Sequence, residues 1–245
     1  MSIPDSNSSA APLRARVILV IDDEEQIRRA VRNALRDLAD RVVEASSGRA
    51  GIDLAGAERP QLIILDLGLP DIPGVDVCRE IRRWAETPIL VLSARHAEAE
   101  KVQLLTVGAD DYVTKPFSLP EFGARVRALV RRARTPNAAA RAVLQTGDGL
   151  TIDFTRRSLA RNGEVIRLTP LEWDILTALA KASARTLTHQ QIFDAVWGRN
   201  FGNPQQYLRV HITNLRRKIE KDASNPQLIM TEAGVGYRFE IPDSS

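Results

Sequence analysis

Four apolar residues followed by a carboxylate, Leu62-Ile63-Ile64-Leu65-Asp66, lie near the middle of the first half of the chain. This pattern predicts a buried strand with Asp66 at its C-terminal tip. Three other apolar runs end in polar groups in the same way. These groups are Asp22 and Asp23 after 17–21, Ser93 after 89–92, and Lys115 after 112–114. If the four strand ends meet, they can hold a metal ion and a phosphoryl group on Asp66.

The first half of the chain alternates short apolar runs with stretches of helical periodicity. The apolar runs are 17–21, 41–45, 61–65, 88–92 and 111–114, and the helical stretches are 24–38, 47–57, 74–86, 96–106 and 119–133. Alternation of this kind predicts an α/β domain with a parallel sheet covered by helices on both faces. Five units fit a flavodoxin-like strand order of 2-1-3-4-5, in which strands 1 and 3 are neighbours. We therefore expect Asp22, Asp23 and Asp66 to meet at the C-terminal rim of the sheet.

The second half has a different pattern, which predicts an α+β winged-helix domain. Short strands are expected within 143–168, with a hairpin turn at Asn162-Gly163. Three helices follow, at 169–182, 188–198 and 205–221, and two strands lie within 228–240. The first helix begins with Thr169-Pro170-Leu171-Glu172, which has the spacing of a capping box. We divide the chain into a tail at 1–14, an α/β domain at 15–134, a linker at 135–142 and a winged-helix domain at 143–245.

Composition narrows the class of protein. The 245 residues are 44% hydrophobic, which suits two globular domains. No stretch reaches the roughly 18 consecutive apolar residues of a membrane span, and the N-terminus has no signal-peptide pattern. Cys78 is the only cysteine, so we expect a small core residue and neither a disulfide nor a metal site built on cysteine. These features favour a cytoplasmic protein.

The expected rim of carboxylates has a clear chemistry. Three carboxylates repel one another unless a cation neutralises them, and Mg²⁺ prefers such hard oxygen ligands, to which the Gly68 backbone carbonyl can add one more. Asp66 can then act as a nucleophile and form an aspartyl phosphate. Lys115 and Ser93 are suited to binding phosphoryl oxygens. Pro116 could fix the approach of Lys115 through a cis bond. Taken singly, each of these residues is better explained as a helix cap or a surface group, but their joint placement at strand ends favours the site.

The net charge of +3 lies in the second half, because residues 1–134 hold 20 Lys+Arg against 20 Asp+Glu while residues 135–245 hold 14 against 11. Much of it is concentrated in the helix at 205–221, whose core stripe is Leu208, Ile212, Leu215 and Ile219. The other face and the following strands offer groups that can contact phosphates and base edges. These are Arg209, His211, Thr213, Asn214, Arg216, Arg217, Lys218 and Arg238. A solvated helix face is the alternative interpretation of the charge alone.

The motifs of the first half resemble a two-component receiver domain. They are Ile21-Asp22-Asp23-Glu24, 65–70 around Asp66, 92–95 around Ser93, and Gly108 to Phe117. The resemblance implies that a histidine kinase phosphorylates Asp66, that Asp22 and Asp23 bind Mg²⁺, and that Ser93 and Tyr112 are switch positions. It also implies dimerisation through the fourth helix, fifth strand and fifth helix. The matching charged positions are Lys101, Asp110, Asp111, Glu121 and Arg125.

The second half resembles the winged-helix effector of the OmpR/PhoB family of response regulators. The matching signatures are Leu168 to Glu172, Val196-Trp197-Gly198 and Gly234 to Phe239. Within that family, 62–71, 91–95 and 207–210 are most similar to the potassium-responsive branch. The resemblance implies a phosphorylation-dependent regulator that dimerises on promoter direct repeats and controls a high-affinity potassium-transport operon. It is not expected to be an enzyme.

Three alternatives remain. A regulator of the same family could control other genes. A phosphatase with an aspartyl-phosphate intermediate is disfavoured, because such hydrolases place a second Asp two residues after the nucleophile and Gly68 stands there. The third is a receiver that serves only for dimerisation, which the intact acidic pair, Ser93 and Lys115 argue against.

Overall fold

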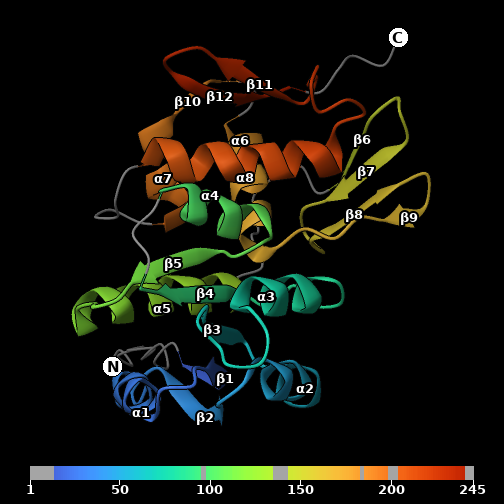
Figure 1. The fold of residues 1–245 in the computed structure, drawn as a ribbon. Helices are drawn as coiled ribbons and strands as arrows, with labels where there is room; N and C mark the ends of the chain where they lie inside the picture. Colours follow the sequence, from blue (N-terminus) through green and yellow to red (C-terminus); the bar gives the residue numbers. More distant parts are fainter. Residues whose placement is uncertain (1–13, 95–97, 135–142, 183–184, 198–203, 241–245) are drawn as a thin grey trace, which may run out of the picture.

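The computed structural model describes residues 14–94, 98–134, 143–182, 185–197 and 204–240, which form two domains (Figure 1). The first domain ends with helix α5 (Leu119–Arg134), and the second begins with strand β6 (Val143–Gln145). The expected linker at 135–142, and the expected tail apart from Arg14, lie outside the described residues.

The first domain is built on a five-stranded parallel sheet in the order β2-β1-β3-β4-β5, which confirms the predicted topology. The strands are β1 (Ala15–Ile21), β2 (Ala39–Ala45), β3 (Leu62–Asp66), β4 (Ile89–Ser93) and β5 (Asp111–Thr114). Every residue of β3 and β4 is buried. Continuous apolar runs are required there because helices cover both faces of the sheet.

The helices divide between the two faces of the sheet. They are α1 (Glu25–Ala34), α2 (Gly48–Glu58), α3 (Gly74–Arg82), α4 (Glu98–Thr106) and α5. Val31 of α1 and Phe122 of α5 belong to the core on one face. Ala55 of α2, Val77 of α3 and Leu104 of α4 belong to the core on the other face. Leu104 of α4 therefore lies in the same apolar core as the inner faces of α2 and α3.

The second domain begins with an antiparallel four-stranded sheet, β6-β7-β8-β9. Its remaining strands are β7 (Leu150–Asp153), β8 (Ser158–Arg161) and β9 (Glu164–Val165). The predicted turn between β8 and β9 is confirmed, with φ of 52° at Asn162 and 87° at Gly163. Positive φ at both central residues is what a tight hairpin turn demands, and Asn-Gly meets that demand at little cost.

Three helices and a small sheet complete the second domain. The helices are α6 (Pro170–Lys181), α7 (His189–Trp197) and α8 (Pro204–Ile219). The sheet consists of β11 (Ile229–Glu232), β12 (Gly236–Phe239) and β10 (Leu187–Thr188). The capping box of α6 is confirmed: the Thr169 hydroxyl accepts from the Glu172 N–H, and the Glu172 carboxylate accepts from the Thr169 N–H. Strand β10 was not predicted, since two residues carry no periodicity.

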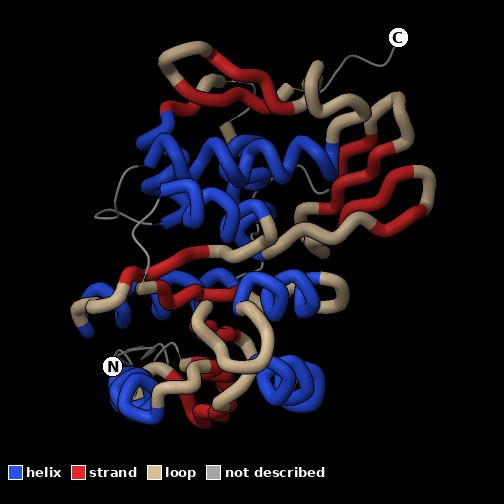
Figure 2. The backbone as a smooth tube through the Cα atoms, viewed as in Figure 1, coloured by secondary structure: helices blue, strands red, loops and turns tan. Residues whose placement is uncertain are grey.

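The two domains are packed together in this structure. Helix α8 lies against α4, and α6 lies against α5 (Figures 1 and 2). The Arg167 guanidinium also donates to the Trp84 carbonyl across the boundary, at 3.2 Å. The sequence offered no expectation about this arrangement.

Candidate functional site

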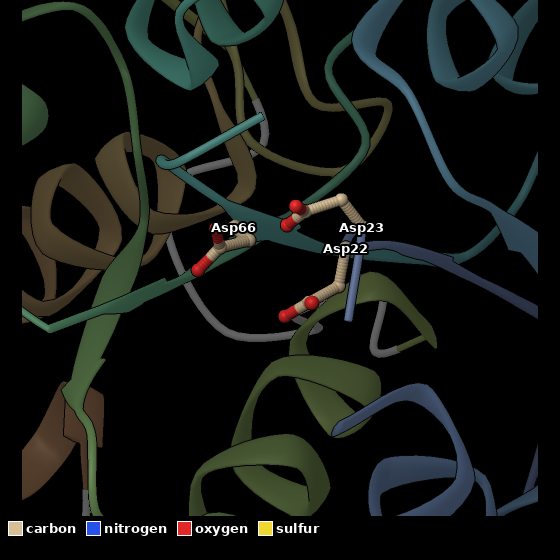
Figure 3. A group of neighbouring side chains, drawn as sticks. All are labelled: Asp22, Asp23 and Asp66. Atoms are coloured by element: carbon tan, nitrogen blue, oxygen red, sulfur yellow. The ribbon is translucent and has the colours of Figure 1, made fainter. Parts of the chain in front are cut away.

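Three carboxylates meet at the C-terminal rim of the first sheet, as expected. Asp66 ends β3, and Asp22 and Asp23 directly follow β1, which pairs in parallel with β3. One oxygen from each carboxylate lies within 4.8 Å of the others (Figure 3). Asp22 is 0% exposed and Asp66 is 6% exposed, whereas Asp23 is open to solvent.

Lys115 reaches the carboxylates from the end of β5. Its Nζ atom lies 2.7 Å from Asp66 Oδ1, 2.9 Å from Asp22 Oδ2 and 3.6 Å from Glu24 Oε1. Burial works against the charged ammonium, but the hydrogen bonds to Asp66 and Asp22 raise the pKa of Lys115 above its usual value. The Lys115–Pro116 bond is cis, as the sequence suggested. Lys115 thus supplies a fixed positive charge beside the acceptor carboxylate.

Asp22 is the most enclosed of the three acids. Burial raises its pKa, the Lys115 ammonium and the Glu24 N–H lower it, and the nearby Asp66 charge raises it again. A carboxylate buried beside a second carboxylate needs a positive neighbour to remain ionised. The donor set consists of hard oxygen ligands, which fits a divalent cation such as Mg²⁺. Figure 3 shows that the three carboxyl groups converge on one region.

Two glycines leave room around Asp66. The Gly68 N–H donates to Asp66 Oδ2 at 2.8 Å, and a Cβ at Gly68 would stand 3.2 Å from that oxygen. A Cβ at Gly74 would meet the Asp66 carbonyl oxygen at 2.3 Å, so only glycine fits there. Sequence reasoning missed Gly74. Its position after Pro73, at the start of a helical stretch, was the available signal.

A depression of about 420 Å³ opens beside Asp66. Lys115 and Ser93 line it, together with Gln103 and Leu104 from α4. Ser93 is 4% exposed at the end of β4. This depression offers space for a phosphoryl group between the acceptor, a hydroxyl and a cation.

Tyr112 is directed to the second domain and is not among the residues that line this depression. Its ring stacks on Tyr207 of α8, with ring centroids 5.1 Å apart and an angle of 8° between the planes. The expected switch aromatic therefore contacts the expected DNA-binding helix.

The expected DNA-binding residues fall into two groups. Arg209, Thr213 and Arg217 are exposed and recur at every fourth position of α8, so they form one stripe. Arg238 is half-exposed and pairs with Glu232 and Glu240. The other four expected residues are engaged inside the molecule.

In this structure the four side chains make internal contacts, and their role in DNA binding stays a prediction. His211 is 3% exposed, with its ring against Trp197 of α7. Asn214 is 8% exposed and donates to the Leu105 carbonyl of α4 at 3.0 Å.

Arg216 and Lys218 hold their own domain together. Arg216 donates to the Ile229 carbonyl and, at 2.8 Å, to the Thr231 hydroxyl of β11. Burial lowers the pKa of Arg216. The Lys218 ammonium lies 2.6 Å from Glu172, the buried acid of the α6 capping box. Periodicity could not show this, because a basic side chain on a polar helix face can turn to an internal acceptor as readily as to DNA.

The expected dimer residues are also partly internal. Asp110 is 1% exposed, and its carboxylate accepts from Arg82 at 2.6 Å and from the Ile89 N–H at 2.8 Å. This burial contradicts its expected place on the surface. Asp111 accepts two hydrogen bonds from Arg125, at 2.9 and 3.0 Å.

The remaining two expected dimer positions are Glu121 and Lys101. Glu121 lies one turn before Arg125 on α5 and pairs with it at 3.0 Å. The side chain of Lys101 lies outside the described residues.

Family models match both domains. The response regulator receiver domain matches residues 18–127, and the C-terminal domain of transcriptional regulatory proteins matches residues 163–239. The chain belongs to the response regulators of the OmpR/PhoB type, which are DNA-binding transcriptional regulators with a phospho-receiver rather than enzymes. Among its described residues, no helix is both long and apolar enough to cross a membrane.

Individual relatives cover almost the whole chain. The transcriptional regulatory protein KdpE of Mycobacterium tuberculosis is 43% identical over 91% of this chain and 99% of its own length. The KDP operon transcriptional regulatory protein KdpE of Escherichia coli is 40% identical with the same coverage. A solved structure of a RitR mutant is 25% identical, with a TM-score of 0.73 over 92% of this chain and 99% of its own. That score spans both domains, so their relative placement is similar in the two structures.

Proposed function

We propose that a sensor histidine kinase phosphorylates this regulator on Asp66, and that phosphorylation promotes DNA binding. The observation that carries the proposal is the position of Asp66, beside two further carboxylates and 2.7 Å from Lys115 Nζ. In the transfer, an Asp66 oxygen attacks phosphorus, the phosphorus–nitrogen bond to the kinase histidine breaks, and the imidazole leaves. Alignment and charge neutralisation supply most of the catalysis of such a step.

Each residue of the rim has a role in this proposal. Asp22, Asp23 and Asp66, with the Gly68 carbonyl, would hold Mg²⁺, which neutralises phosphoryl charge when bound. Lys115 pairs with a second phosphoryl oxygen, and Ser93 donates to a third. In the absence of phosphate, Lys115 holds Asp66 and Asp22 together through ion pairs of 2.7 and 2.9 Å.

Phosphorylation is proposed to favour a receiver dimer on the face formed by α4, β5 and α5. Asp111, Glu121 and Arg125 lie on that face, and Lys101 belongs to α4. The dimer would place two α8 helices on direct repeats in a promoter. Joining two weak DNA-binding modules raises affinity through effective concentration. Arg209, Thr213 and Arg217 are proposed as exposed DNA contacts, with Arg238 from the wing.

A high-affinity potassium-transport operon is the proposed target. The similarity to KdpE proteins over nearly the full chain supports this choice. Because the phosphoryl donor and promoter DNA are both inside the cell, the proposed place of action is the cytoplasm. The alternative is a regulator of the same family with a different set of genes.

The phosphoacceptor is tested by mass spectrometry. The full-length protein, incubated with acetyl phosphate and Mg²⁺, should gain one phosphoryl group with loss of acetate from the donor. Asp66→Asn should gain none. Asp76→Asn is the matched control, since Asp76 is an exposed acid of α3 that pairs only with Arg79 among the described contacts. Equal labelling of Asp66→Asn would disprove the assignment.

The proposed regulon is tested by footprinting the phosphorylated protein on the transporter promoters of its own source organism. Protection of paired direct repeats beside a potassium-transport operon is expected. Protection only at other promoters would favour the alternative regulator.

A further inference from the structure

The three carboxylates of the rim are held in different ways. Asp22 accepts hydrogen bonds from the Lys115 ammonium and from the Glu24 N–H, both at 2.9 Å. Asp66 lies 2.7 Å from the same ammonium. Within the part of the chain that the structure describes, the Asp23 carboxylate makes no hydrogen bond or ion pair. The direction in which Asp23 presents its carboxylate therefore depends on its backbone.

One side chain of α1 holds that backbone. The Nη1 atom of Arg28 donates to the Asp22 carbonyl at 2.8 Å and to the Asp23 carbonyl at 2.9 Å. These carbonyls belong to the two peptide units on either side of the Asp23 Cα atom. Since each peptide unit is planar, only the φ and ψ angles of Asp23 lie between them. A single nitrogen that binds both oxygens therefore restrains both angles, and with them the direction of the Asp23 side chain.

Glu44 of β2 holds the guanidinium of Arg28 in place. Its Oε2 atom lies 3.5 Å from Arg28 Nε, and its Oε1 atom lies 2.8 Å from Nη1 of Arg32, one turn further along α1. The Arg28 side chain is only 15% exposed. The Glu44 carboxylate offsets its charge, which would otherwise oppose the binding of a cation by Asp23.

The position of Arg28 does not favour the helix to which it belongs. Arg28 is among the first four residues of α1, where the helix dipole favours acids such as Glu25 and opposes cations. The next residue, Arg29, is exposed and pairs with Glu25 at 3.2 Å. Arg28 instead binds the carbonyls that precede the helix. Its contacts therefore serve the acidic loop rather than α1.

We propose that Arg28 is a positioning residue for the rim: by binding the carbonyls on both sides of Asp23, it directs that carboxylate towards the place where a divalent cation binds. The inference rests on the proposed function, because it concerns the cation that Asp22, Asp23 and Asp66 are proposed to hold. Arg28 acts through Asp23 and touches neither the cation nor the phosphoryl group. Groups that orient metal ligands in this way commonly change metal affinity about 10- to 100-fold.

The affinity for a divalent cation is the first test, and it needs no phosphoryl donor. The full-length protein is titrated with Mn²⁺, which takes the same oxygen ligands as Mg²⁺, and the free ion is measured by electron paramagnetic resonance. Arg28→Ala should raise the dissociation constant about tenfold or more. Arg29→Ala, which removes the adjacent exposed arginine of the same helix, should leave it unchanged. The same constant in Arg28→Ala and the wild type would overturn the proposal.

A double-mutant cycle separates positioning from a general loss of structure. If Arg28 acts through Asp23, Asp23→Asn already removes most of what Arg28 contributes. Arg28→Ala should therefore weaken Mn²⁺ binding much less in the Asp23→Asn background than in the wild type. Equal effects in both backgrounds would mean that Arg28 does not act through Asp23, and the proposal would fail. Urea denaturation of all four proteins shows that each is folded under the conditions of the titration.

The dependence of labelling on Mg²⁺ gives a readout that lower stability alone does not move. With acetyl phosphate, Arg28→Ala should need about tenfold more Mg²⁺ for half-maximal labelling of Asp66, and it should approach the wild-type rate at saturating Mg²⁺. Less labelling at every Mg²⁺ concentration, with the midpoint unchanged, would show a folding defect and contradict the proposal. If the wild type is not labelled on Asp66, the proposed function fails, whereas the Mn²⁺ comparison still decides the role of Arg28.

Discussion

The direction and the partners of single side chains in this molecule depend on the groups that surround them. Asp110 and Asp111 are adjacent in sequence, yet Asp110 turns inward to Arg82 while Asp111 pairs with Arg125 at the domain boundary. Arg82 also donates to the Gly108 carbonyl at 2.8 Å, so it ties α3 to the segment before β5. Both carboxylates are buried, at 1% and 2% exposed, and each is paired with an arginine of a different helix, α3 or α5.

Asp110→Ala should therefore destabilise the receiver. It leaves the Arg82 guanidinium, 10% exposed, without its carboxylate, and breaking a buried pair costs roughly 3–5 kcal/mol. Urea denaturation measures the free energy of unfolding. Asp76→Ala, which breaks a surface pair, should cost less than about 1 kcal/mol. An unchanged free energy of unfolding together with lost dimerisation would instead support the expected role of Asp110 in the dimer interface.

Cys78 provides a second prediction at this scale. Burial raises the pKa of its thiol from 9.0 to about 11. The thiolate is the reactive form, so at pH 8 the native protein should react with iodoacetamide about 100-fold more slowly than the unfolded chain. Mass spectrometry of samples quenched with and without urea gives the two rates. Equal rates would mean that α3 opens readily.

At the scale of elements, α8 contacts both the core of its own domain and the receiver, and it exposes a third face to solvent. Its stripe of Leu208, Ile212 and Leu215 enters the core of its own domain. Tyr207 and Asn214 face the receiver, and Arg209, Thr213 and Arg217 face solvent. Arg216 reaches β11 and lies 5.8 Å from the centre of the Tyr237 ring. A single basic helix thus combines packing, docking and exposed charge.

Replacing each of two arginines of α8 by alanine should accordingly have different effects, one mainly on DNA binding and the other on stability. Arg209→Ala should weaken DNA binding with little loss of stability, and it should reduce the salt dependence of binding if Arg209 contacts a phosphate. Arg216→Ala should lower the free energy of unfolding by about 1–3 kcal/mol, because the Ile229 carbonyl and the Thr231 hydroxyl lose a charged donor. Fluorescence anisotropy at several salt concentrations and urea denaturation separate the two effects. Similar effects of both substitutions would contradict this division.

At the scale of the whole molecule, the domain contact links events that lie far apart in sequence. Tyr112 and Tyr207 are in different domains, and so are Leu105 and Asn214, but each pair is in contact. If phosphorylation of Asp66 and DNA binding favour the same arrangement of the two domains, each event must favour the other.

Excess duplex DNA should therefore increase the extent to which acetyl phosphate labels Asp66 in the wild-type protein. In Tyr207→Ala the stack between Tyr112 and Tyr207 is lost and the contact between the domains is weakened, so DNA should add less. Intact-protein mass spectrometry, with and without the promoter duplex, measures both. An equal effect of DNA on the two proteins would place the coupling outside the α4–α8 contact.

The sequence alone determined the strand order, the helices and the gathering of Asp22, Asp23, Asp66, Ser93 and Lys115 at one rim. It could do so because these features depend on local periodicity and on the rule that parallel strands end at one edge. The helix cap at Thr169 and the turn at Asn162-Gly163 also depend only on residues that are close together in the sequence.

Only the tertiary structure decided which polar side chains of α8 and of the segment before β5 are buried. The burial of Asp110, His211 and Asn214 depends on partners 28, 14 and 109 residues away in sequence, in Arg82, Trp197 and Leu105. No periodicity in a single helix or strand encodes such a partner. The meeting of Tyr112 with Tyr207 has the same origin: two domains that each fold by local rules are set against each other by surfaces that matter only once both are formed.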